Sequence, residues 1–218
     1  KNYDELYEGD VTMHRALTKS LNTVAVQVSE AAGRDTVIET ARRLGITAPL
    51  RPHPSIALGS FEVNLLELTS AYAHFANGGF QTFPYIIDAA ITKSGTILYE
   101  RIAPAPPRVI APRQVAAMND MLVATIKTGT GRRAAIEGQI LAGKTGTSQN
   151  WRDAWFIGYS GALVAGVWVG NDNGAPMNKV TGSGLPAQIW RAFMTSQENT
   201  VALPGYENGA GKSGGLLD

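Results

Sequence analysis

The 218-residue chain contains no cysteine, which excludes a disulfide framework and thiolate ligands for a metal. Its three histidines, His14, His53 and His74, lack metal-ligand spacing, so the sequence predicts neither a metal nor another cofactor. Basic and acidic residues nearly balance, 19 against 18, and no nucleic-acid partner is expected. The longest apolar stretch, residues 162–169, falls well below the roughly 18 residues of a membrane span.

Hydrophobic periodicity predicts helices in the first third of the chain and strands further on. Thr12, Asp35 and Asn64 are each placed to cap a helix. The expected helices cover residues 12–33 with a break at Ser20, then 35–44, 64–77, 112–127 and 186–195. The expected strands cover residues 85–92, 96–100, 140–147, 154–159 and 163–169.

This order of elements favours an α+β fold, with an antiparallel sheet packed against helices, because short connections join the last strands. The apolar content of 44% is enough for the core of one globular unit. We expect that unit to cover residues 1–203, followed by a flexible Gly-rich tail over residues 204–218. Residues 128–131 lack the ending of a phosphate loop and are predicted to form a turn.

Two short motifs carry chemistry. Lys144-Thr145-Gly146-Thr147 joins an apolar strand to a cation, two hydroxyls and a bare backbone, which suits an anionic substrate. Ser20-Leu21-Asn22 interrupts the first helical region. Each motif alone has a structural explanation, as a strand end with a turn or as a helix cap.

Together the two motifs match two of the three motifs of the active-site serine enzymes, S-x-N and K-T-G, in the same chain order. Residues 9–12, 57–63, 75–79 and 152–159 extend the likeness. Over roughly residues 2–196 the chain resembles the transpeptidase domain of a bifunctional, class A penicillin-binding protein. The resemblance implies a serine β-lactamase/transpeptidase-like fold and a peptidoglycan D,D-transpeptidase that crosslinks stem peptides.

The resemblance also implies catalytic roles. Ser20 relays a proton to the leaving amine, and Lys144 supplies positive charge beside it. The backbone N–H of Thr147 is one of two donors to the oxyanion. These groups serve acyl transfer from a D-Ala-D-Ala peptide, or acylation by a β-lactam.

Four residues are expected to bind the substrate. The hydroxyls of Thr145 and Thr147 can donate hydrogen bonds to the terminal carboxylate, and Asn22 can bind the amide of the donor peptide. Gly146 has no side chain, so a peptide can approach the strand edge and pair with it.

The third motif of these enzymes, the S-x-x-K that carries the nucleophile, is absent, because no serine has a lysine three positions later. In the family this motif lies upstream. We therefore expect the chain to be the C-terminal portion of a transpeptidase domain, incomplete at its N-terminus and inactive alone. The missing part of the domain is its expected partner. An upstream anchor would place it in the bacterial cell envelope, at the outer face of the cytoplasmic membrane.

Two alternatives stay open. A D,D-carboxypeptidase or β-lactamase uses the same motifs, although no E-x-x-x-N stretch of a deacylating loop lies between them. The absence of S-x-x-K also fits a non-catalytic module that binds a peptide or partner on a retained transpeptidase scaffold.

Overall fold

The computed structural model describes residues 2, 7–102, 105–197 and 201–206. The α-helices are α1 Met13–Lys19, α2 Asn22–Ala32, α3 Arg34–Arg43, α4 Leu65–Ala76, α5 Pro112–Lys127 and α6 Leu185–Thr195. The strands are β1 Ala89–Ile91, β2 Ile97–Glu100, β3 Ala142–Thr147, β4 Asp153–Tyr159 and β5 Val164–Gly170. Short 3₁₀ turns are η1 Pro54–Leu58, η2 Arg132–Ala134 and η3 Gln149–Trp151.

Polar side chains fix two of the helix starts as predicted. The Thr12 hydroxyl accepts a hydrogen bond from the Arg15 N–H at 3.2 Å, and Asn64 Oδ1 accepts one from the Glu67 N–H at 2.8 Å. The predicted cap at Asp35 is wrong, because α3 begins one residue earlier with Gly33 as its cap. Asp35 instead lies in the first turn, where its negative charge favours the helix dipole.

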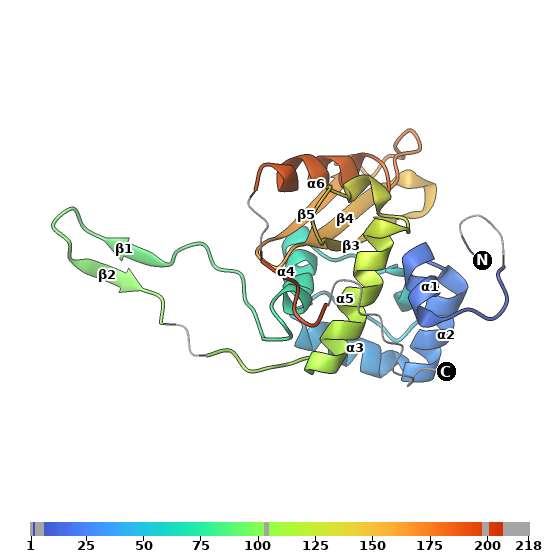
Figure 1. The fold of residues 1–218 in the computed structure, drawn as a ribbon, viewed down its shortest axis with the longest axis horizontal. Coiled ribbons are helices and arrows are strands. Elements are labelled where there is room, and N and C mark those ends of the chain that lie inside the picture. Colours follow the sequence, from blue (N-terminus) through green and yellow to red (C-terminus); the bar gives the residue numbers. More distant parts are fainter. Residues whose placement is uncertain (1, 3–6, 103–104, 198–200, 207–218) are drawn as a thin grey trace.

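The main sheet has the strand order β3-β4-β5 and is antiparallel throughout. Helix α6 packs on one face of β4 and β5, while α4 packs on the other face and α5 lies against β3 (Figure 1). The α+β prediction and the antiparallel pairing are therefore confirmed. No helix among the described residues is long and apolar enough to cross a lipid bilayer.

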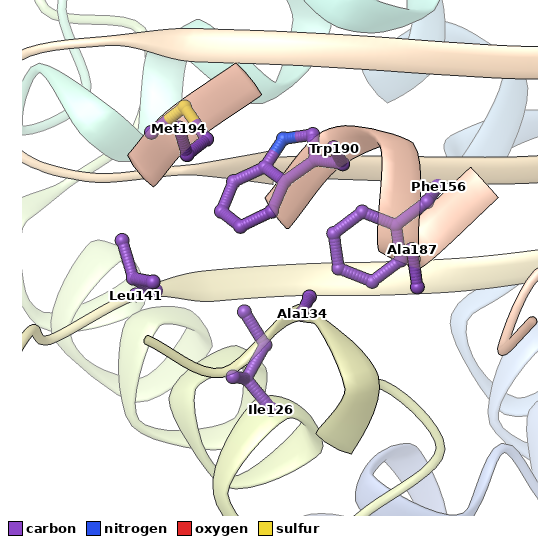
Figure 2. Packing of buried hydrophobic residues seen from close by; sticks show 7 residues of the cluster. All are labelled: Ile126, Ala134, Leu141, Phe156, Ala187, Trp190 and Met194. Carbon is purple, nitrogen blue, oxygen red and sulfur yellow. The ribbon is translucent and has the colours of Figure 1, made fainter. Parts of the chain in front are cut away.

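The core beneath α6 is built around Trp190, which is fully buried. Its indole N–H donates to the carbonyls of Gly158 and Ala165, at 3.3 and 3.1 Å, and its ring centroid lies 5.1 Å from that of Phe156. Figure 2 shows this pair within the cluster formed by Ile126, Ala134, Leu141, Phe156, Ala187, Trp190 and Met194. The cluster joins α5, α6 and the sheet, and so fixes β3 relative to both helices.

The predicted hairpin forms from β1 and β2, with Thr92 N–H donating to Thr96 O at 2.9 Å. Its strands are shorter than the periodicity indicated, since residues 85–88 are not in a strand. The hairpin projects away from the rest of the chain, and its apolar side chains, such as Ile97 and Leu98, are exposed (Figure 1).

The chain packs beyond the boundary expected at residue 203. Leu203 is buried, Asn119 Nδ2 donates to Pro204 O at 2.9 Å, and Lys127 Nζ donates to Tyr206 Oη at 2.9 Å. Residues 204–206 therefore pack against α5, and the predicted start of a flexible tail at Pro204 is wrong, because its backbone carbonyl satisfies a buried amide. The rest of that predicted tail, residues 207–218, lies outside the described residues.

Replacing Trp190 with alanine should lower the free energy of unfolding by about 3–5 kcal/mol, because it leaves a large cavity between α6 and the sheet. The matched control is Phe193→Ala on the same helix, where the side chain is 48% exposed and the loss should stay below about 1 kcal/mol. Urea unfolding followed by circular dichroism measures both. Equal losses would contradict this description of the core.

Candidate active site

Ser20 stands at a sharp turn between two helices. It ends α1 with left-handed backbone angles, φ 58° and ψ 47°, and α2 begins two residues later at Asn22. The turn is closed by hydrogen bonds from Ser20 N–H to Leu17 O and from Leu21 N–H to Ala16 O, at 3.1 and 2.9 Å. A non-glycine residue in this conformation costs of order 1–3 kcal/mol, and such strain gathers at functional sites. The predicted break in the helix is confirmed.

Lys144 comes from β3 and meets Ser20 across 124 residues of sequence. Its ammonium donates to Ser20 Oγ at 2.6 Å and to Thr145 O at 3.1 Å. Desolvation by burial lowers the pKa of Lys144 to about 8. The two motifs therefore form one site, with a serine hydroxyl held against an amine that titrates near neutral pH.

Strand β3 is the edge strand of its sheet among the described residues, so one side of its backbone is unpaired there. Thr147 lies opposite Ala154, and the next N–H, of Ser148, donates inward to Asp153 O at 2.9 Å. Because alternate residues of an antiparallel edge strand turn their N–H groups inward and outward, the Thr147 N–H faces outward. This is the direction an oxyanion donor needs.

The Thr147 hydroxyl is oriented by the segment before α6. It accepts a hydrogen bond from the Gly182 N–H at 3.0 Å. Since a backbone N–H can only donate, the hydroxyl keeps its own proton for a ligand. Gly182 comes this close because it has no side chain: a Cβ there would overlap the carbonyl oxygens of Gly146 and Trp155.

The Thr145 hydroxyl has a partner that the sequence did not indicate. Its Oγ1 lies 2.8 Å from Thr130 Oγ1, in the turn after α5. The Thr130 N–H in turn donates to Thr18 O at 3.3 Å, near the end of α1. Sequence reasoning assigned residues 128–131 to a turn only, and their composition carries no signal for the two contacts.

Gly146 and Asn22 complete the predicted set. A Cβ at Gly146 would lie 3.3 Å from Trp155 Cβ, so the glycine also makes room for the tryptophan on the neighbouring strand. Asn22 is the first residue of α2 and is partly buried. The structure thus joins Ser20 to Lys144, places Thr145, Gly146 and Thr147 on the same strand end, and sets Asn22 beside the Ser20 turn.

A family model described as the penicillin binding protein transpeptidase domain matches residues 1–195. The chain belongs to this family. Curated relatives include penicillin-binding protein 1A of Aquifex aeolicus, 40% identical over 195 residues, and that of Neisseria meningitidis, 33% identical over 202 residues. Each alignment covers 89% of this chain but only 27% and 25% of those relatives, so the chain spans about a quarter of their length. The predicted resemblance to this family is confirmed.

Solved structures of the family have the same fold. Penicillin-binding protein 1A from Haemophilus influenzae superposes with a TM-score of 0.82 at 26% identity, covering 94% of this chain and 37% of that one. PonA1 from Mycobacterium tuberculosis in complex with penicillin V gives a TM-score of 0.81 at 25% identity, covering 94% of this chain and 64% of that one. The transpeptidase-like fold predicted from the motifs is confirmed.

Gly182→Ala should lower the free energy of unfolding by about 1–3 kcal/mol, because the new methyl group overlaps two backbone carbonyls and pushes residues 180–184 away from β3. Gly184→Ala is the matched control, since its Cβ would lie no nearer than 3.2 Å to another atom. Urea unfolding compares the two. A Gly182 variant no less stable than the Gly184 variant would contradict the close packing of this segment on β3.

Proposed function

We propose that this chain carries the proton-relay and carboxylate-binding half of a peptidoglycan D,D-transpeptidase site. The observation that carries the proposal is the 2.6 Å hydrogen bond from Lys144 Nζ to Ser20 Oγ, which joins the S-x-N and K-T-G motifs. In the proposed reaction, a serine nucleophile attacks the peptide carbonyl of a D-Ala-D-Ala stem peptide. The terminal D-Ala leaves, and the amine of a second stem peptide then takes the acyl group.

Ser20 moves the proton in this scheme. The bond between the two D-Ala residues breaks as the leaving nitrogen gains a proton; the Ser20 hydroxyl is the donor, and it is restored by the proton that the nucleophilic serine gives up. Lys144 holds Ser20 Oγ through its ammonium and stabilises negative charge on that oxygen as its proton leaves. A lysine whose pKa is about 8 can also return a proton to Ser20 between turnovers.

The end of β3 binds the substrate in this proposal. The hydroxyls of Thr145 and Thr147 donate to the terminal carboxylate, and the outward N–H of Thr147 donates to the oxyanion. Gly146 lets the peptide backbone approach the strand edge, and Asn22 holds the donor peptide's amide. The charge of the Lys144 ammonium makes the site electropositive for this anionic end of the substrate.

The nucleophile must come from a segment that carries S-x-x-K, because no serine of this sequence has that pattern. An uncovered surface supports this part of the proposal. Helix α2 is rich in apolar residues, yet only Ser29 is buried among its residues, and Val28 is 38% exposed. A further segment of the same domain packed on this surface would bring its serine beside Ser20 and bury α2.

The proposal places the protein in the bacterial cell envelope, facing the peptidoglycan, with β-lactams as inhibitors that acylate the same serine. Support comes from the family, and from the solved PonA1 structure, which is a complex with penicillin V. An anchor for this location would lie in a segment other than the helices described here.

Intact-mass spectrometry after exposure to a labelled penicillin tests the proposal. We expect a covalent adduct on the chain extended N-terminally through an S-x-x-K segment, and none on the present chain alone. In the extended form, Lys144→Met should slow adduct formation by at least about a hundredfold, because it removes charge at the reacting centre. The control Lys93→Met lies in the β1–β2 hairpin and should react at the wild-type rate.

Other outcomes would replace the proposal. An adduct on the present chain alone would refute the assignment of the nucleophile to another segment. No adduct on a folded extended form would favour a non-catalytic peptide- or partner-binding module. Rapid hydrolysis of a chromogenic cephalosporin by the extended form would favour a β-lactamase instead.

A further inference from the structure

We propose that Thr130 is a positioning residue, which orients the Thr145 hydroxyl so that its proton points to the carboxylate of the substrate. The two hydroxyl oxygens lie 2.8 Å apart, and both side chains are partly buried. The inference rests on the function proposed above, and concerns a residue outside the S-x-N and K-T-G motifs.

The backbone at Thr130 is fixed from both sides. Its N–H donates to Thr18 O at 3.3 Å, and the N–H of Gly131 donates to Thr125 O at 3.0 Å in the last turn of α5. Gly129 permits this contact, because a Cβ there would overlap Thr18 O. The Thr130 hydroxyl therefore faces β3 from a turn that is hydrogen-bonded to Thr18 in α1, and Thr18 lies two residues before Ser20.

The direction of the hydrogen bond follows from the charge of the ligand. A hydroxyl has one proton, and a carboxylate can only accept. When Thr145 donates its proton to a carboxylate, the bond between the two hydroxyls requires Thr130 to donate to Thr145 Oγ1. A charge-assisted bond to the carboxylate is stronger than one between neutral hydroxyls, so the bound state selects this arrangement.

The neighbouring hydroxyl has the same arrangement. Thr147 Oγ1 accepts a hydrogen bond from the Gly182 N–H. A backbone N–H can only donate, so the direction of this hydrogen bond is fixed. Thr130 and Gly182 thus act on Thr145 and Thr147 from two separate segments. Each of the two hydroxyl oxygens accepts a hydrogen bond from one of these residues, and each hydroxyl can therefore donate its own proton to the carboxylate of the substrate.

The test uses the N-terminally extended chain and two ligands, benzylpenicillin and its methyl ester. Thr130→Val, which keeps the shape but removes the hydroxyl, should lower the second-order acylation rate for benzylpenicillin about tenfold, the usual effect of one lost hydrogen bond. The rate for the ester, which has no carboxylate, should change less than about twofold. Thr130→Ser should restore the wild-type rate with benzylpenicillin.

Thr128→Val is the matched control, because the Thr128 hydroxyl donates its hydrogen bond to Ala124 O within the end of α5. It should acylate at the wild-type rate with both ligands. If Thr130→Val does not fold, as judged by circular dichroism, Thr130→Ala takes its place with the same expected ratio between ligands.

Equal losses with the acid and the ester would overturn the proposal, because they would indicate a purely structural role for Thr130. An unchanged rate with benzylpenicillin in the Val or Ala variant would overturn it as well. Both results leave the proposed function intact, since the wild-type protein still forms an adduct. A wild-type extended chain that forms no adduct overturns the proposed function and this inference together.

Discussion

The contact between Lys144 and Ser20 organises the site. One motif lies at the end of the edge strand and the other at a break between two short helices, and the 2.6 Å hydrogen bond joins them. The bond places a cation against a serine hydroxyl, and desolvation by burial lowers the pKa of that cation to about 8, so that it stays mostly charged at neutral pH. A charge so poorly solvated is stabilised when an anion binds or develops beside it.

The neighbouring elements hold the two residues of this contact in position. The core around Trp190 packs α6 and α5 against the sheet and thereby holds β3 in place relative to both helices. The turn after α5 bridges Thr18 and Thr145, so the helix that ends at Ser20 and the strand that carries Lys144 share a second connection. Two independent links between the motifs make their spacing a property of the fold rather than of two flexible side chains.

Local chemistry made much of the fold predictable. Asn64 was identifiable as a cap because its side chain replaces a missing backbone partner, and the order of elements implied the antiparallel sheet. Partners distant in sequence were not predictable from propensity. The contacts of Thr130, Gly182 and Pro204 depend on which segments meet in space, whereas the pairing of Ser20 with Lys144 was expected only through the resemblance to a family.

Titration of Lys144 by NMR, with isotope-labelled lysine side chains and Lys144→Arg to assign the signal, examines this organisation on the present chain without any ligand. We expect a pKa of about 8, because folding removes water from the ammonium as it packs against Ser20 and β3. A pKa at the ordinary value of 10.5 would show a solvated lysine, and would contradict the joined site.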